Sequence, residues 1–260
     1  MTLAVVEFRS YEESVREALD NLHASGILEK QQSILVKPNL ICNAKPPVTT
    51  PVRCCEAIVK YVRSCSDAKI TIAEGCGEPG TETSELFDIL GYSKLARNLN
   101  IDLVDLNTVP VRKLRNADNR VFQDMYLPKL AFESFIISVP VLKAHSIAAI
   151  TGSLKNMMGF APPSHYGKGG FWKKAAFHAR MHEAIVELNR FRGPDLSVMD
   201  ASIGLAEYHL GGRRLRPPAN RILAGFDPLD LDRKAAELLG LDWRDIGHLS
   251  SPLQVKMLSG

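Results

Sequence analysis

The sequence predicts an α/β fold with a mostly parallel sheet and helices on both of its faces. Short apolar runs alternate with longer amphipathic stretches along the chain, which is typical of β–α units. Several of the runs are almost continuously apolar, as in 33–37 (SILVK) and 69–74 (KITIAE), which favours strands buried on both faces. With 260 residues, of which 45% are apolar and 23% charged, the chain is large enough to bury a core without disulfides or metals.

The expected elements follow one another in this alternating order. The predicted strands are the apolar runs 3–8, 33–37, 69–74, 101–106, 134–139, 196–199 and 221–224. The predicted helices are the amphipathic stretches 11–24, 51–64, one that begins near 84, 174–192 and 228–239. Pro38 and Pro140 end two of the strands, Pro51 opens a helix at its first position, Ser84 caps the next, and Gly240 closes the last.

Two stretches have no long periodicity. Residues 107–128 are expected to form a short β excursion. Residues 157–173 contain two adjacent prolines and four glycines, and are expected to be a lid or insert over a site, or else a flexible surface loop. The whole of 1–260 is otherwise predicted to be a single domain, without repeats or low-complexity linkers.

Composition excludes several classes of protein. The net charge of +3 is small and dispersed, so we expect no nucleic-acid partner. No apolar stretch approaches 18 residues and the N-terminus lacks a basic region, so we expect no membrane partner, no signal peptide and a cytoplasmic location. The five cysteines include no CxxC pair, so an iron–sulfur cluster is not encoded by such a motif.

Polar side chains follow most of the predicted strands. Ligands in open α/β sheets bind beyond the carboxyl ends of the strands, so we expect these residues to converge on one crevice. The alternative is that strand ends simply meet water. The residues concerned are Lys37, Asn39, Glu74, Lys143, His145, Asp200 and Asp227.

The lysines point to an anionic ligand. Lys37 and Lys143 follow apolar strands, where a lysine can pair with a carboxylate, bind an anion or act as a base. Lys155 and Asn156 follow the step 151–153 (TGS), which suits a helix N-terminus with free amide donors. The alternative for each lysine is a surface position beside an acid. Together they predict a site for a small anionic molecule.

Two histidines have the spacing of metal ligands. His178 and His182 are four residues apart on the predicted helix 174–192 and would share one face. This spacing can hold a divalent metal, although an exposed polar face has the same pattern and the glutamate of an HExxH motif is absent. His145 and His165 are the candidates to complete such a site.

The segment Gly75–Gly80 matches the letters of a GxGxxG motif after a strand. Pro79 precedes the third glycine and the next helix is expected only near Ser84, so the third glycine does not lead into a helix as the motif requires. We therefore predict a plain connecting loop here, with dinucleotide binding as the weaker alternative.

A series of short motifs resembles a known family. These motifs, in order, are KPN at 37–39, TTP at 49–51, AEG at 73–75, GY at 91–92, VDLN at 104–107, VPVLKAH at 139–145, TGSLKNMMG at 151–159, DA at 200–201 and DPLDLD at 227–232. In this order they resemble the domain-of-unknown-function 362 family over nearly the whole chain. The K-x-H block followed by TGSLKN is the most specific part.

The resemblance implies a limited amount about function. Many family members carry a ferredoxin-like module and are described as iron–sulfur proteins, a module that this sequence does not match. The family core is in turn distantly similar to the lactate racemase family, which implies two lobes around a cleft with Lys and His inside. Where the family has a GMEGxGP run after Asp200, this sequence has Gly204–His209 (GLAEYH), so the acid expected in that run has moved or gone.

Two functional hypotheses follow. In the first, the protein is an enzyme acting on a small carboxylate, with isomerase- or racemase-like or metal-assisted transfer chemistry. Lys37, Lys143, His145 and Lys155 would be catalytic, and His178 and His182 would be metal ligands or proton carriers. The residues that would bind or orient the substrate are Asn39, Thr49, Thr50, Asn156, Asp200 and Asp227. In the second hypothesis, the protein is an iron–sulfur-associated redox or cofactor-binding accessory with a redox partner protein.

Overall fold

The computed structural model describes residues 2–251. The strands in this part of the chain are β1 (Leu3–Glu7), β2 (Ser33–Pro38), β3 (Lys69–Glu74), β4 (Asp102–Asp105), β5 (Val111–Arg115), β6 (Asp124–Pro128), β7 (Phe135–Val139), β8 (Val141–His145), β9 (Ala149–Thr151), β10 (Leu196–Leu205) and β11 (Arg221–Gly225). No helix among the described residues is both long and apolar enough to cross a bilayer.

The helices are short and lie between these strands. They are α1 (Tyr11–Asn21), α2 (Ser25–Leu28), α3 (Val52–Cys65), α4 (Thr83–Ile89), α5 (Tyr92–Leu99), α6 (Ser153–Asn156), α7 (Pro163–Tyr166), α8 (Met181–Phe191), α9 (Pro228–Leu238) and α10 (Gly247–Ser250). Four 3-10 turns join them, η1 (Lys129–Phe132), η2 (Met157–Phe160), η3 (Ala175–Arg180) and η4 (Trp243–Asp245).

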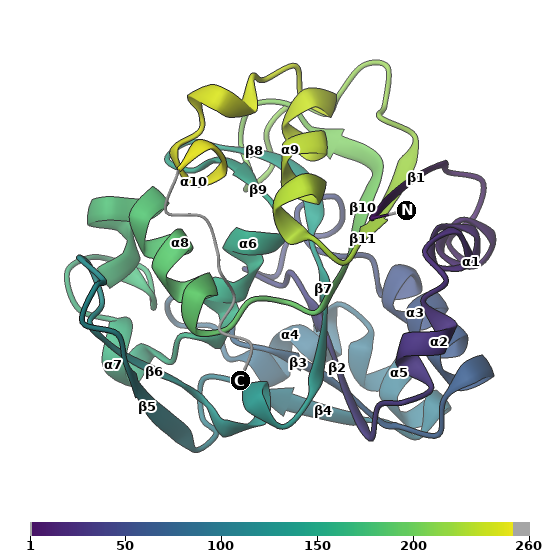
Figure 1. Ribbon diagram of the computed structural model, residues 1–260, viewed down its shortest axis with the longest axis horizontal. Coiled ribbons are helices and arrows are strands. Elements are labelled where there is room, and N and C mark those ends of the chain that lie inside the picture. The colour runs from purple at the N-terminus through teal and green to yellow at the C-terminus, as the bar shows by residue number, and fades with distance from the viewer. Residues whose placement is uncertain (1, 252–260) are drawn as a thin grey trace.

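A nine-stranded sheet forms the centre of the described region (Figure 1). Its order is β1–β11–β10–β7–β2–β3–β4, with β8 paired to β10 and β9 paired to β8. The pairs from β10 through β7, β2 and β3 to β4 are parallel, and so is the β10–β8 pair, whereas the pairs made by β1, β11 and β9 are antiparallel. The predicted α/β fold with a mostly parallel sheet is therefore confirmed.

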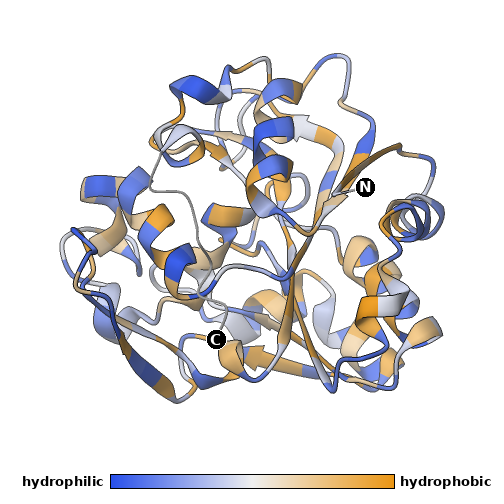
Figure 2. Cartoon of the chain, viewed as in Figure 1, coloured by the Kyte–Doolittle hydropathy of each residue, from blue (hydrophilic) through white to orange (hydrophobic). Residues whose placement is uncertain are grey.

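The sheet separates two apolar cores. In β2, Ile34 and Val36 face the core shared with α1–α5, whereas Leu35 faces the core shared with α6–α10. The same alternation recurs in β7 and β11, as the two-residue period of a strand requires. Figure 2 shows apolar segments concentrated along the central strands, with polar residues on the outer helix faces. Helices cover both faces, as the near-continuous apolar runs predict.

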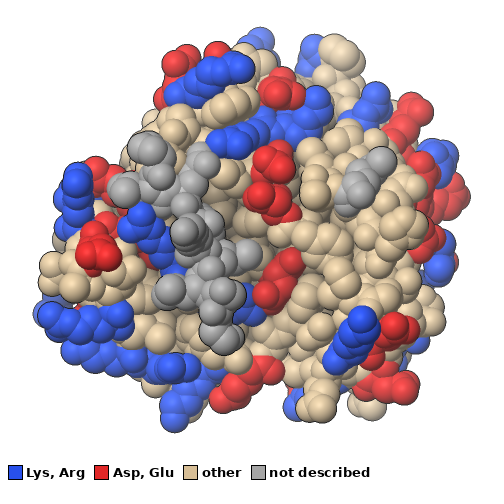
Figure 3. All heavy atoms as spheres, in the orientation of Figure 1, with Lys and Arg blue, Asp and Glu red and all other residues tan. Residues whose placement is uncertain are grey.

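The surface charges are mixed. Figure 3 shows lysines and arginines interspersed with acids over the face in view, with the basic side chains gathering near the β5–β6 ribbon at the lower left. This ribbon is the β excursion expected within 107–128, and it pairs antiparallel outside the main sheet. The net charge of +3 gives no information about the lysines of the predicted anion site, because Lys37 and Lys143 are buried.

Three expected boundaries change in the structure. The stretch 174–192 is not one α-helix: η3 ends at Arg180, whose backbone is not helical (φ −138°), and α8 begins only at Met181. Pro51 is the cap of α3 rather than its first helical residue. Helix α4 is capped by Glu82, which forms a reciprocal capping box with Glu85, so Ser84 lies inside the helix.

The sheet splits at Pro140. Strand β7 pairs with β2 up to the contact of Val139 with Pro38. Beyond Pro140 the chain continues directly as β8, which pairs with β10 instead of β2. The carboxyl end of β2 therefore loses its neighbour just where the polar motifs of β2 and β8 begin, and this divergence positions the site.

Candidate functional site

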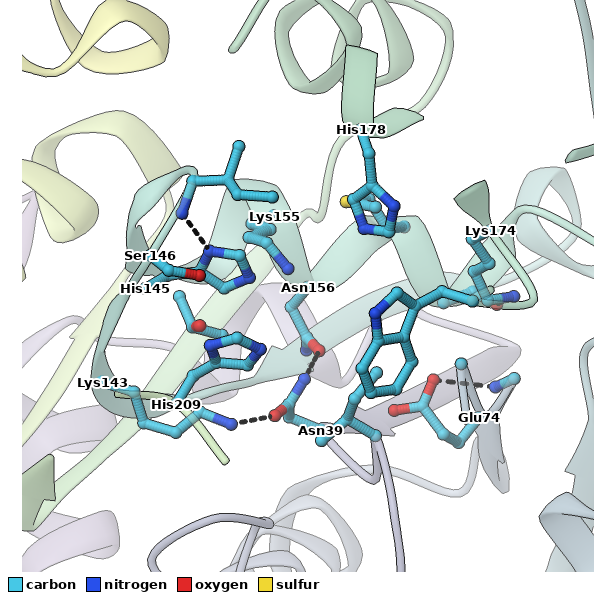
Figure 4. Close-up of a pocket in the computed structure, with 18 of the residues that line it drawn as sticks. Asn39, Glu74, Lys143, His145, Ser146, Lys155, Asn156, Lys174, His178 and His209 are labelled. Atoms are coloured by element: carbon cyan, nitrogen blue, oxygen red, sulfur yellow. Dashed lines mark hydrogen bonds between the residues drawn. The ribbon is translucent and has the colours of Figure 1, made fainter. Parts of the chain in front are cut away.

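A cavity of about 150 Å3 lies where β2 and β8 diverge. It is smaller than the roughly 300–1,000 Å3 of typical ligand pockets, so it suits a compact ligand. Four lysines and one acid line it: Lys37, Glu74, Lys143, Lys155 and Lys174. Figure 4 shows the side chains of Glu74, Lys143, Lys155 and Lys174 arranged around the same space. They come from β3, β8, α6 and the loop before η3, and Lys37 comes from β2. The expected convergence of polar residues on one cavity is therefore seen for part of the set.

Lys37 and Glu74 form a saturated buried ion pair. The Lys37 Nζ lies 2.9 and 3.0 Å from the two Glu74 carboxylate oxygens and also donates to the Pro38 carbonyl and the Asn156 amide oxygen. The Glu74 carboxylate in turn accepts the amide hydrogens of Leu40 and Gly75. All three Lys37 donors are engaged, so this lysine holds the end of β2 to β3 and has no donor left for a ligand.

Two asparagines connect Lys37 to Lys143. Asn156 Oδ1 accepts from Lys37 Nζ at 3.0 Å and from Asn39 Nδ2 at 3.1 Å. Asn39 Oδ1 accepts from Lys143 Nζ at 2.7 Å. The Asn156 amide group also donates to Ser138 and to the Lys37 carbonyl. Both asparagines line the cavity. Their side-chain amides hold the lysines in place, whereas the sequence predicted that they orient a substrate.

Lys174 completes the cationic lining, and the sequence motifs give no signal for it. It is buried, and its Nζ donates to Asn107 Oδ1 at 2.8 Å and to the carbonyls of Gly159 and Ala161. These three acceptors use its three donors. Lys174 therefore fixes the segment around η2 against the loop after β4, while adding positive charge to the cavity.

Lys143 and Lys155 keep donors free. Lys143 uses two of its three, toward Asn39 and the Val48 carbonyl. Among residues 2–251, the Lys155 ammonium has no hydrogen-bond or ion-pair partner. The cavity thus presents one donor from Lys143 and the whole amine of Lys155 to a ligand.

Burial makes these amines titrate near neutral pH. Burial, then the charge of the neighbouring Lys155, lowers the pKa of Lys143 to about 7. Burial, then the charge of Lys37, lowers the pKa of Lys155 to about 8. Burial lowers the pKa of Lys174 to about 7 against the opposing effect of Glu74. Glu74 is the one carboxylate among the lining residues, so little negative charge balances the repulsion among these lysines. An anion that entered the cavity would reduce this repulsion.

His145 is held as a neutral hydrogen-bond donor. Its Nδ1 accepts the backbone amide hydrogens of Ile147 and Ala148, both at 3.1 Å, which leaves the ring proton on Nε2. Burial, followed by the charge of Lys155, lowers its pKa far below the ordinary range. His145 is therefore suited to donate a hydrogen bond from Nε2, and is not suited to act as a base at Nδ1.

His209, His178 and Thr151 supply further polar groups to the cavity. The His209 ring stacks on His145 with centroids 3.8 Å apart, and its Nδ1 is buried without a partner among the described residues. Burial and Lys155 lower the pKa of His209 to about 3 and also lower that of His178. The Thr151 hydroxyl is likewise buried and unpartnered within residues 2–251.

The N-terminus of α6 is already capped, so its amides are not available to an anion. The buried Asp232 accepts the amide hydrogens of Ser153 at 2.6 Å and Leu154 at 2.9 Å. A Cβ at Gly152 would lie only 2.3 Å from this carboxyl group, which explains the glycine. The expectation of free amide donors at 151–153 is wrong, and Asp232 instead fixes the helix that carries Lys155.

Four expected ligand residues are not among those that line the cavity. Thr49 donates to the Ala44 carbonyl, and Thr50 donates to Val139 and accepts from the Asn39 amide, so both shape the loop after β2. Asp200 lies within β10 and accepts from Tyr11 and Ser202. Asp227 is an exposed cap of α9, and β11, which precedes it, runs antiparallel to β10 and ends at the opposite edge of the sheet.

His178 and His182 do not share one face of an α-helix, because the break at Arg180 lies between them. His178 lines the cavity, whereas His182 contacts His248, with 2.8 Å between the Nδ1 atoms. Stacked rings cannot aim their in-plane nitrogens at one ion, which excludes His145 and His209 as a ligand pair. Within residues 2–251 no cluster of three or more His, Cys, Asp or Glu has the arrangement of a cation site, so the donors do not fit a bare divalent metal.

The cysteines are separate from this cavity. Cys54 and Cys55 are fully buried in α3, and burial raises the pKa of both thiols. Cys42, Cys65 and Cys76 are also free thiols. Each is a packed or half-buried thiol rather than part of a ligand cluster among the described residues.

The segments 75–80 and 157–173 both border the cavity. A Cβ at Gly75 would lie 2.3 Å from the Gly159 carbonyl, so close packing explains that glycine without a nucleotide. The Lys173 amide donates to the Gly77 carbonyl at 3.0 Å, which ties the two segments together. Met158, Gly159 and Trp172 of the second segment line the cavity, so it forms part of the wall.

A mixed α/β sheet whose strands separate around a buried, cationic, histidine-lined cavity defines the class of this protein: an α/β protein with an interior cationic cavity. The chain belongs to the family described as Domain of unknown function (DUF362), which matches residues 34–237. That range includes every residue of the cavity lining.

One solved structure with a similar fold is the lactate racemase apoprotein from Thermoanaerobacterium thermosaccharolyticum. The TM-score is 0.56 and the identity is 15%, over 93% of this chain and 57% of that one. The chain thus spans little more than half the length of that protein, and the similarity concerns the fold. No curated protein matches the sequence.

Proposed function

We propose that the protein is an enzyme that acts on a small carboxylate by moving a proton beside the carboxylate group, as an isomerase or racemase does. The observation that carries this proposal is the set of unsatisfied groups in one cavity. Lys143 and Lys155 have free cationic donors, and three histidines, His145, His178 and His209, surround the same space. Every other charged group there is saturated.

The cationic donors favour a carboxylate over a neutral ligand. A charge-assisted hydrogen bond is about twice as strong as a neutral one, and the low dielectric of a buried site strengthens it further. The Thr151 hydroxyl adds a neutral donor for a second substrate oxygen. The similarity to a lactate racemase structure supports the same substrate class without establishing it.

The histidines have complementary tasks in this proposal. His145 donates a hydrogen bond from Nε2, where its proton is fixed by the amides of Ile147 and Ala148. His209 and His178 have ring nitrogens without partners among residues 2–251 and can accept a proton from the substrate. One ring thus stabilises developing negative charge on the substrate while an unprotonated ring takes the proton, which are the two roles that such a transfer requires.

Carboxylate binding is expected to weaken as the pH rises. The ligand stays ionised, but Lys143 and Lys155 lose their protons as the pH passes their lowered pKa values of about 7 and about 8. Affinity should therefore be constant below about pH 6 and fall by up to about tenfold per pH unit for each lysine above about pH 8. Calorimetry in two buffers of different ionisation enthalpy should show proton uptake on binding in this range. An affinity independent of pH, or one that rises with it, would contradict the assignment.

Deuterium exchange tests the reaction itself. We expect the protein in D2O to exchange the C2 hydrogen of a small 2-hydroxy acid or a C3 hydrogen of a small 2-oxo acid, which NMR can follow over a panel of such acids. His209→Phe keeps the ring stacked on His145 and removes the nitrogen, and should slow exchange by about 10²-fold or more. His182→Gln, outside the cavity, is the control and should exchange at the wild-type rate. Equal rates for the two variants would refute the role of His209.

A further inference from the structure

The four cavity lysines differ in how their amines are held. Lys37 has three acceptors, Lys174 has three and Lys143 has two. Lys155 has none among residues 2–251. The Lys155 ammonium lies in a cationic cavity and has no acceptor among residues 2–251, so its charge does not stabilise the fold. The position of this lysine therefore calls for a functional explanation.

The Lys155 amine lies close to every histidine in the cavity. After burial, its charge is the largest cause of the lowered pKa of His145, His209 and His178 alike. Figure 4 shows its side chain directed into the space between His145, His178 and Asn156. Helix α6, which carries it, is fixed by the buried Asp232. Lys155 is thus a free amine on a rigid support, surrounded by groups that transfer protons.

We propose, resting on the function proposed above, that Lys155 is a nucleophile that condenses with the carbonyl carbon of a small 2-oxo acid to form an imine. In its charged form Lys155 would help to bind the carboxylate of that acid, and in its neutral form it would attack the carbonyl carbon. Lys143 and the Thr151 hydroxyl would hold the carboxylate during the attack, and His145 would donate a hydrogen bond to the carbonyl oxygen. This narrows the substrate class to carboxylates with an adjacent carbonyl.

The step balances without an external oxidant or reductant. The neutral amine of Lys155 forms a C–N bond while the C=O electron pair moves to oxygen, which accepts a hydrogen bond from His145 Nε2. One N–H proton passes to this oxygen by way of a neighbouring histidine, which gives the neutral carbinolamine. The second N–H proton follows the same route as the C–O bond breaks, so the oxygen leaves as water and the imine remains. In an acid such as pyruvate the imine makes the C3–H bonds beside it acidic, so a histidine of the cavity can then remove a proton from that carbon. The neutral amine is available because burial keeps the pKa of Lys155 near 8.

The other lysines are excluded by their contacts. Attack by Lys37 would break its pair with Glu74, and attack by Lys174 would leave two buried carbonyls without a donor. Lys143 could attack only by giving up Asn39 and Val48. The inference therefore assigns the adduct to one residue out of four in the same cavity.

Borohydride trapping tests this assignment. The full-length wild-type protein is incubated with pyruvate or glyoxylate, reduced briefly with sodium borohydride and mapped by peptide mass spectrometry. We expect the reduced adduct on Lys155 at least about tenfold above that on the exposed Lys30, which controls for general amine reactivity. The Lys155→Met variant should form no adduct at position 155. In Lys143→Met, Lys155 should still react, but the amount of adduct should depend less on the carboxylate group of the 2-oxo acid.

The outcomes separate this inference from the proposed function. An adduct on Lys143 or Lys174, or labelling of Lys155 no greater than that of Lys30, would overturn the imine. The wild-type map alone decides this, so a variant that does not fold leaves the test intact. If pyruvate still binds by calorimetry while Lys155 remains unlabelled, the carboxylate site stands and only the imine fails. If pyruvate neither binds nor labels, both fail.

Discussion

Replacing both Lys143 and Lys155 with methionine is expected to weaken the binding of a small carboxylate by about 10²–10⁴-fold, because each lysine contributes about 1.5–3 kcal/mol through a charged hydrogen bond. These are the two cavity lysines with donors left for a ligand. Methionine keeps the approximate length and apolar character of the stem, so packing is largely retained. Calorimetric titration of wild type and variant with the same acid measures the effect.

A matched control separates site charge from overall charge. Lys30 and Lys60 are both on the surface, and Lys60 pairs only with Glu56. The double variant Lys30→Met, Lys60→Met removes the same formal charge and should bind with wild-type affinity. Equal losses in the two double variants would show that the cavity lysines act only through the net charge of the molecule.

Replacing Lys37 with methionine is expected to destabilise the fold by about 3–5 kcal/mol, since it leaves the buried Glu74 carboxylate without its partner. The loss is large because Glu74 also holds the amides of Leu40 and Gly75, which fix the ends of β2 and β3. Urea unfolding followed by circular dichroism measures the difference in the free energy of unfolding.

The control for Lys37 is again a surface pair. Lys60→Met breaks the exposed Lys60–Glu56 contact and should cost less than about 1 kcal/mol. The paired variant Lys37→Met, Glu74→Gln should recover part of the stability lost in Lys37→Met, because no unpaired charge remains. If Lys37→Met lost no more stability than Lys60→Met, the buried Lys37–Glu74 pair would not be what fixes the ends of β2 and β3.

The strands of the core were predictable because continuous apolar runs leave few alternatives. Strand β8 was not, since Pro140 is typical of a strand end and Lys143 and His145 interrupt the apolar pattern. The structure continues there because β10 supplies a new partner beyond the end of β7. The single helix predicted over 174–192 was wrong because its helical pattern spans Arg180, where the backbone leaves the helical region.

Part of the site was predictable because some of its residues lie at the carboxyl ends of parallel strands. Lys37 and Glu74 meet because β2 and β3 are parallel neighbours. The same rule predicted that Asp200 and Asp227 would join the site. They do not, because β10 continues to Leu205 and β11 is antiparallel. Lys174 and His209 come from irregular segments whose approach to the cavity depends on long-range packing, and no local spacing marks them.

Calorimetry with matched pairs of ligands tests the central claim most directly. Each pair is a small 2-hydroxy or 2-oxo acid and its amide, such as lactate with lactamide and pyruvate with pyruvamide, which differ in the charge of one group. The account predicts that at least one acid binds at near-neutral pH about tenfold or more tightly than its amide, and that this preference disappears in the Lys143→Met, Lys155→Met variant. Amides that bind as well as acids, or a preference for the acid that survives in the variant, would contradict a carboxylate site in this cavity.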